Sequence, residues 1–134
     1  MWSAIQAEAV PLFRFSQYLE SLMLREGTYH NLAALQTVTE GDAEFEAILI
    51  TTFVNEAPGI VESMESAYND GDLETTGRQA HSLKPNAQMF GIDSIHEDLL
   101  FIEGCGKEDR DDDQLPALIQ RVKNVVLQVV KELS

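Results

Sequence analysis

Two side chains that could together carry a phosphoryl group lie three residues apart in the sequence, at His81 and Lys84. In a helix this spacing makes them neighbours on one surface, with Cβ atoms about 5–6 Å apart. The ordinary pKa of histidine is about 6.5, so at neutral pH most of the imidazole is uncharged and has a nucleophilic nitrogen. A phosphoryl group on that ring would bring about 1.5 to 2 negative charges, which a nearby ammonium stabilises by on the order of 1 kcal/mol. The pair therefore predicts a phosphoryl-accepting His81, with Lys84 supporting the phosphate charge.

The helix that must present these residues has a separate apolar stripe. Leu83, Ala87 and Phe90 recur at i, i+4 and i+7, the spacing of a face that packs on a core. His81 lies off this stripe, so we expect its imidazole to be exposed to solvent. The alternative interpretation is a surface histidine with an incidental lysine nearby.

Four further residues of the same helix are candidates for binding a partner or the phosphate. Gly77, one turn before His81, would leave the approach to the imidazole open. Arg78 is a weaker candidate than Lys84 for holding phosphate, and its alternative role is an ordinary surface charge. Pro85 has no N–H for the His81 carbonyl, so we expect it to bend the helix without breaking it and to add bulk near the imidazole. Gln88 completes this set of candidate binding residues.

The pattern around His81 resembles a known signature. His81-x-Leu83-Lys84 with Gly91 ten residues after the histidine is similar to the motif of histidine-containing phosphotransfer (HPt) domains. Ile102-Glu103 resembles the Leu-Glu pair that this family has one helix further on. Phe53-x-x-x-Ala57-Pro58 and Gly71-Asp72-Leu73 also fall where the family pattern has such residues. The resemblance covers roughly residues 31–133, and the sequence departs from it at Pro85, where the family usually has glycine.

The resemblance implies an all-α fold, an antiparallel up-and-down four-helix bundle with His81 exposed midway along one helix. It implies that His81 takes a phosphoryl group from the aspartyl phosphate of one response-regulator receiver domain and passes it to an aspartate in another. A hybrid sensor histidine kinase is a further possible partner. We expect no cofactor in this chain, because magnesium would come with the receiver. The sequence has no phosphate-binding glycine loop, so we expect a carrier that binds no ATP, rather than an enzyme.

Two other functions fit parts of the sequence. A helical module could dock receiver domains or a kinase without carrying phosphate, and Pro85 beside the reactive residue favours this alternative. A metal site built from His30, His81 and His96 is disfavoured, since no two of them have ligand spacing on one helix.

Composition and charge exclude several classes. A length of 134 residues with 44% hydrophobic content predicts one globular domain. The net charge of −14 argues against nucleic acid and against anionic membrane surfaces, which both require basic patches. Cys105 is the only cysteine, which excludes an intrachain disulfide and favours the cytoplasm. We expect no signal peptide, because the first residues lack a positively charged region and a continuous apolar stretch, and no membrane span, because no apolar run approaches ~18 residues.

Helical periodicity extends along the whole chain. We expect an N-terminal extension over residues 1–28, whose helix either covers the bundle or serves dimerisation or docking, and a bundle domain over residues 29–134. Pro58 should kink the long helix that Asp42 caps or weaken its hydrogen bonding locally, and Gly104 to Asp113 should form a polar loop. The helices expected in the bundle domain span residues 32–38, 43–68, 73–90, 94–102 and 118–133.

Overall fold

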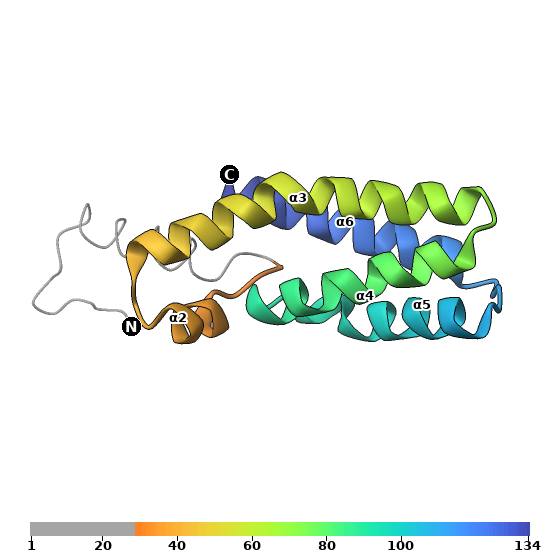
Figure 1. Ribbon diagram of the computed structural model, residues 1–134, viewed down its shortest axis with the longest axis horizontal. Coiled ribbons are helices and arrows are strands. Elements are labelled where there is room, and N and C mark those ends of the chain that lie inside the picture. Colours follow the sequence, from red (N-terminus) through yellow and green to blue (C-terminus); the bar gives the residue numbers. More distant parts are fainter. Residues whose placement is uncertain (1–28) are drawn as a thin grey trace, which may run out of the picture.

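A computed structural model of the chain describes residues 29–134, and all regular structure in this range is helical (Figure 1). The elements are α2 (Ala33–Thr39), α3 (Ala43–Asn69), α4 (Leu73–Met89), the short 3-10 helix η1 (Asp93–Ile95), α5 (His96–Glu108) and α6 (Leu115–Leu133). Within these residues there is no β-strand, which confirms the all-α prediction. The helix expected in residues 2–26 lies outside the described part of the chain.

Two aspartates cap the starts of α3 and α4, and the sequence indicated Asp42 as one of them. Asp42 accepts hydrogen bonds from the amides of Glu44 and Phe45 at the start of α3, at 3.0 and 3.1 Å. Asp72 accepts from the Thr75 amide at 3.0 Å and begins α4. Each carboxylate satisfies N–H groups that have no partner inside the helix. The predicted cap at Asp42 is therefore confirmed, and so is the predicted start of a helix at residue 73.

Gly91 ends α4 and lets the chain preceding α2 pack against it. Its φ of +62° lies in the left-handed region, which glycine adopts without strain. A Cβ atom at this position would lie 2.4 Å from the carbonyl oxygen of Asn31. The Asn31 amide donates to the Phe90 carbonyl at 2.9 Å, so this contact fixes the end of α4.

Both interior prolines are accommodated within continuous helices. Pro58 lies inside the 27 residues of α3, and Pro85 lies inside the 17 residues of α4. Neither proline breaks its helix, as predicted for Pro85. Whether Pro85 bends α4 and whether it changes the choice of partner stay predictions.

One predicted loop is wrong in its first half. Residues 104–108, expected to belong to a polar loop, form the C-terminal part of α5. Cys105 is buried in the core, and Gly106 is buried against α4. Gly104 and Gly106 weaken the helical pattern of the sequence, but tertiary packing outweighs their low helix propensity. The connection between α5 and α6 is thus confined to residues 109–114.

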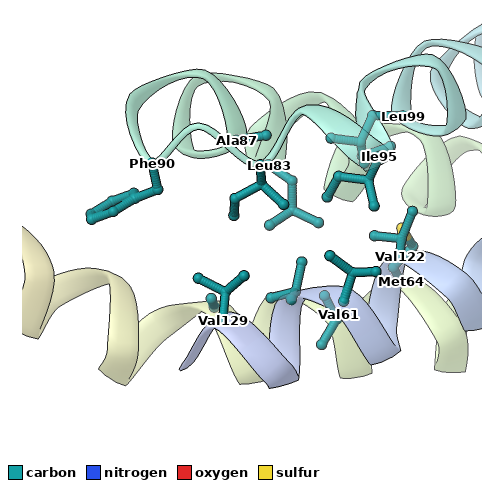
Figure 2. Packing of buried hydrophobic residues seen from close by; sticks show 14 of the residues in the cluster. Val61, Met64, Leu83, Ala87, Phe90, Ile95, Leu99, Val122 and Val129 are labelled. Atoms are coloured by element: carbon teal, nitrogen blue, oxygen red, sulfur yellow. The ribbon is translucent and has the colours of Figure 1, made fainter. Parts of the chain in front are cut away.

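The core forms between α4 and the two helices facing it. Leu83, Ala87 and Phe90 are at most 4% exposed, which confirms the predicted stripe. Figure 2 shows them pointing toward the side chains of α3 and α6 on the opposite side. The Phe90 ring also packs on Phe53 of α3, with centroids 4.5 Å apart. The residues that Figure 2 labels on the facing helices are Val61, Met64, Val122 and Val129.

Polar contacts supplement the packing between helices. α4 packs against α3 and α5, and α6 packs against the same two helices. Arg121 of α6 donates two hydrogen bonds, of 2.6 and 2.7 Å, to the buried carboxylate of Asp98 on α5. Lys123 of α6 pairs with Glu65 of α3 at 2.7 Å. Among residues 29–134, no helix combines the length and hydrophobicity that crossing a bilayer requires.

Candidate functional site

His81 lies on the outer surface of α4, with 67% of its side chain exposed. Its neighbours Ala80 and Leu83 are buried, so α4 presents the imidazole to solvent while its opposite side packs on the core. This placement agrees with the sequence-based expectation that the ring lies off the apolar stripe.

A buried carboxylate on α5 holds the imidazole. Glu103 is 5% exposed, and its Oε2 lies 2.6 Å from Nδ1 of His81. The other oxygen, Oε1, lies 2.6 Å from Nζ of Lys84. Lys107, one turn further along α5, places its Nζ 3.4 Å from Oε2. His81 and Lys84 are therefore brought together through Glu103, a third residue on the neighbouring helix.

The pKa of Glu103 is lowered from 4.5 to about 2. The hydrogen bond from Lys84 is the largest cause, and the bond with His81 and the charge of Lys107 act in the same direction. Burial opposes them, because it disfavours a charged group. Glu103 is consequently ionised throughout the physiological pH range.

The ionised carboxylate determines which nitrogen of His81 carries the proton. A carboxylate can only accept hydrogen bonds, so Nδ1 at 2.6 Å must be the donor. In a neutral imidazole with the proton on Nδ1, the lone pair resides on Nε2. Nε2 is therefore the nucleophilic nitrogen.

Two glycines allow α4 and α5 to approach closely enough for this contact. A Cβ atom on Gly77 would lie 2.8 Å from the Cα of Gly106, and one on Gly106 would lie 2.6 Å from the Cα of Gly77. Real Cβ atoms do not approach other atoms so closely, so neither position has room for a side chain. Gly77 thus has a packing role in addition to the open approach that its sequence position suggested.

A shallow groove of about 440 Å³ runs beside the imidazole, between α4 and α5. Arg78 lies at its edge and is 65% exposed, with its guanidinium 3.8 Å from Glu74 and 3.0 Å from the Thr75 hydroxyl. The groove is lined by Glu74, Gly77, Arg78, His81, Glu103, Gly106 and Lys107. Two of the predicted binding residues, Gly77 and Arg78, therefore border the same space as the imidazole.

Pro85 and Gln88 continue the exposed surface of α4 beyond His81. Both side chains are exposed, at positions one and two turns along the helix. Neither lines the groove. Their predicted contribution to partner binding is compatible with their exposure and stays a prediction.

The sequence alone indicates no role for Glu103 or Lys107. Glu103 enters only through the family resemblance, although it follows Ile102 directly on the face of α5 that packs inward. A carboxylate next to an apolar stripe is a usable signal, because a buried charge needs a partner. The identity of that partner depends on how α4 and α5 pack, which the spacing of 22 residues does not reveal.

The other two histidines do not join this site. His30 is buried, and its Nδ1 lies 2.7 Å from Glu132 near the end of α6. His96 lies at the start of α5. Within residues 29–134 no three metal-binding side chains are grouped in a way that could hold an ion.

A comparison with family models places this site in a known context. The model described as the Hpt domain matches residues 48–132, well over half of the chain. The match includes His81, Lys84 and Glu103. Comparisons with curated proteins and with solved structures give no match.

Proposed function

The chain belongs to the Hpt domain family, whose members are phosphotransfer carriers of two-component phosphorelays, and we propose on this premise that it carries the phosphoryl group on His81. The observation that supports this assignment most directly is the bond between Nδ1 of His81 and the ionised Glu103. It leaves an exposed Nε2 with a lone pair, which is the atom that a phosphoryl acceptor needs.

The proposed donor and acceptor are receiver domains of response regulators. Nε2 attacks the phosphorus of an aspartyl phosphate, the P–O bond to the aspartate breaks, and the carboxylate leaves with the electron pair. The imidazole ring gains positive charge as the N–P bond forms. Glu103, which accepts from Nδ1 at 2.6 Å, stabilises that charge without taking the proton. The reverse reaction with a second receiver returns the group to an aspartate.

The remaining candidate residues support this step in different ways. Lys84 is 24% exposed and binds Glu103 at 2.6 Å, so it keeps the carboxylate ionised and in place. We assign it support of the phosphate charge together with Arg78. Gly77, Pro85 and Gln88 shape the surface that a receiver contacts. Magnesium is supplied by the receiver, and this chain needs no cofactor of its own.

We also infer the finer arrangement of the fold and the setting of the protein. The helices α3 to α6 form an antiparallel four-helix bundle, because each packs on two of the others and short connections join them. Residues 29–134 are the bundle domain and residues 1–28 an extension. The cytoplasm is the proposed location, since the lone Cys105 is buried as a thiol.

Transfer from phosphorylated receivers tests the proposed function. A panel of receiver domains, phosphorylated with a small-molecule donor and magnesium, is mixed with the wild-type chain, with His81→Gln and with His96→Gln. We expect an acid-labile, alkali-stable label on the wild type and on His96→Gln, and none on His81→Gln. The His81→Gln variant should keep its stability to within about 1 kcal/mol, because the side chain is largely exposed.

The same experiment separates the carrier from a module that only docks. If receivers bind the chain but never transfer phosphate to it, the docking function is correct and the carrier function is wrong. A label that persists on His81→Gln would assign the phosphoryl group to another residue.

A further inference from the structure

Cations are concentrated around His81 in an otherwise acidic protein. The chain has nine Lys and Arg residues and a net charge of −14. Three of the nine belong to this site: Arg78 and Lys107 line the groove beside the imidazole, and Lys84 binds Glu103. Two carboxylates, Glu74 and Glu103, also line the groove, so three positive and two negative charges surround His81, and an approaching anion meets less repulsion than the net charge of −14 would suggest.

The two lysines that contact Glu103 are held to different degrees. Lys84 is 24% exposed and its Nζ lies 2.6 Å from the carboxylate. Lys107 is 74% exposed and its Nζ lies 3.4 Å away, on the oxygen that already accepts from His81. Because the Lys107 side chain is largely in solvent and the distance is long, this ion pair contributes little free energy although Glu103 is buried, so Lys107 can leave Glu103 at low cost.

We propose that Lys107 leaves Glu103 when His81 is phosphorylated and, together with Arg78, holds the phosphoryl group in the groove. This inference rests on the proposed function of His81. A phosphoryl group offers about two negative charges and three acceptor oxygens, whereas Glu103 offers Lys107 one oxygen that is already shared. Glu103 loses little by the exchange, because Nδ1–H of the phosphorylated ring and Lys84 still bind its two oxygens.

The position of Lys107 is suited to this exchange. It lies on α5, on the opposite side of the groove from Arg78 on α4, and both border the space that His81 faces. Arg78 is itself 65% exposed, and its guanidinium lies 3.8 Å from Glu74 and 3.0 Å from the hydroxyl of the half-buried Thr75. A phosphate on Nε2 can thus be approached by one cation from each helix.

The test uses phosphoramidate, which phosphorylates histidine without a partner protein. Nε2 attacks the phosphorus, the P–N bond of the donor breaks, and the nitrogen leaves as ammonia. The phosphorylated wild type, Lys107→Gln, Lys107→Arg and a control, Lys131→Gln, are then titrated by 31P NMR. Lys131 is an exposed lysine of α6 that does not line the groove.

A cation close to the phosphoryl group stabilises the dianionic form of that group. It therefore lowers the pH at which the phosphoryl group takes up a proton. We expect this pH to rise by about 0.3 to 0.7 unit in Lys107→Gln, the equivalent of one exposed ion pair. Lys107→Arg and Lys131→Gln should titrate like the wild type, and the rise should shrink at high salt. Circular dichroism checks that each variant is folded.

Identical titrations of the wild type and Lys107→Gln would overturn the role of Lys107 and leave the proposed function intact. An equal rise in Lys131→Gln would also overturn it, since any surface lysine would then have the same effect. If phosphoramidate places no phosphate on His81 of the wild type, the proposed function fails and this inference fails with it.

Discussion

Replacing Glu103 by glutamine removes the charge of the carboxylate and keeps its shape. The pKa of Glu103 falls from 4.5 in the unfolded chain to about 2 in the folded protein. At about 1.4 kcal/mol for each pH unit, this difference corresponds to about 3 kcal/mol of folding free energy. Solvent around the exposed His81 and Lys107 screens part of it, so we expect Glu103→Gln to lose about 2 to 3 kcal/mol near neutral pH.

The sign of the pH dependence follows from the lowered pKa. Above pH 4.5 Glu103 is ionised in both states, and its contribution to stability is fully present. Between pH 4.5 and about 2 only the unfolded chain takes up the proton, so the contribution is progressively lost. The wild type and Glu103→Gln should therefore differ most near pH 7 and converge as the pH falls toward 2.

Urea unfolding followed by far-UV circular dichroism at several pH values measures this difference. Glu97→Gln is the control, because it removes an exposed carboxylate from the first turn of the same helix. A difference between wild type and Glu103→Gln that stays constant from pH 7 to pH 3 would refute the reasoning. So would a loss no larger than that of the control.

The same substitution should slow phosphoryl acceptance. The amide introduced by Glu103→Gln can donate to Nδ1 of His81, which would place the imidazole proton on Nε2 and remove the nucleophilic lone pair. If the tautomer equilibrium shifts by about 1.4 kcal/mol, the fraction of His81 with a lone pair on Nε2 falls about tenfold. The rate at which phosphoramidate labels His81 should fall by the same factor. An unchanged rate would mean that Glu103 does not select the tautomer.

Two further substitutions test the backbone around the site. Gly106→Ala should destabilise the protein by about 1 to 3 kcal/mol, because the new methyl group would lie 2.6 Å from the Cα of Gly77. Gly104→Ala, in the same helix with nothing within 4 Å, should stabilise it by about 0.5 to 1 kcal/mol. In thermal unfolding, Gly106→Ala should therefore lower the melting temperature and Gly104→Ala should raise it. Equal changes in the two variants would show that the close contact between Gly77 and Gly106 is unimportant. Pro85→Ala restores an N–H to α4 and should raise stability by about 1 to 2 kcal/mol in urea unfolding, whereas no gain would show that α4 accommodates the proline without cost.

The sequence predicted those features that depend on neighbours along the chain. Helix starts at Asp42 and Asp72, the apolar stripe from Leu83 to Phe90 and the exposure of His81 all follow from residue types at fixed short spacing. Each depends on the geometry of a single helix, which repeats regularly. For the same reason His81 could be proposed as the phosphoryl acceptor before its surroundings were known.

Features that depend on contacts between helices were not predictable in this way. The role of Glu103 requires the register between α4 and α5, and no short-range pattern encodes that register. The prediction of a loop at Gly106 was wrong for the same reason. A glycine next to polar residues indicates a loop, whereas here it permits close contact between two helices. The C-terminal part of α5 was therefore mistaken for a loop.

The contact between Gly77 and Gly106 also constrains how the protein can evolve. When two large side chains meet, one can grow if the other shrinks, and such paired changes keep a core filled. Here both partners are already the smallest residue, so an enlargement at either position has no compensating change at the other. The contact lies one turn from His81 on α4 and one turn from Glu103 on α5. If substitutions moved the two helices apart, the contact between the imidazole and the carboxylate would be lost. It could form again only through longer side chains at new positions.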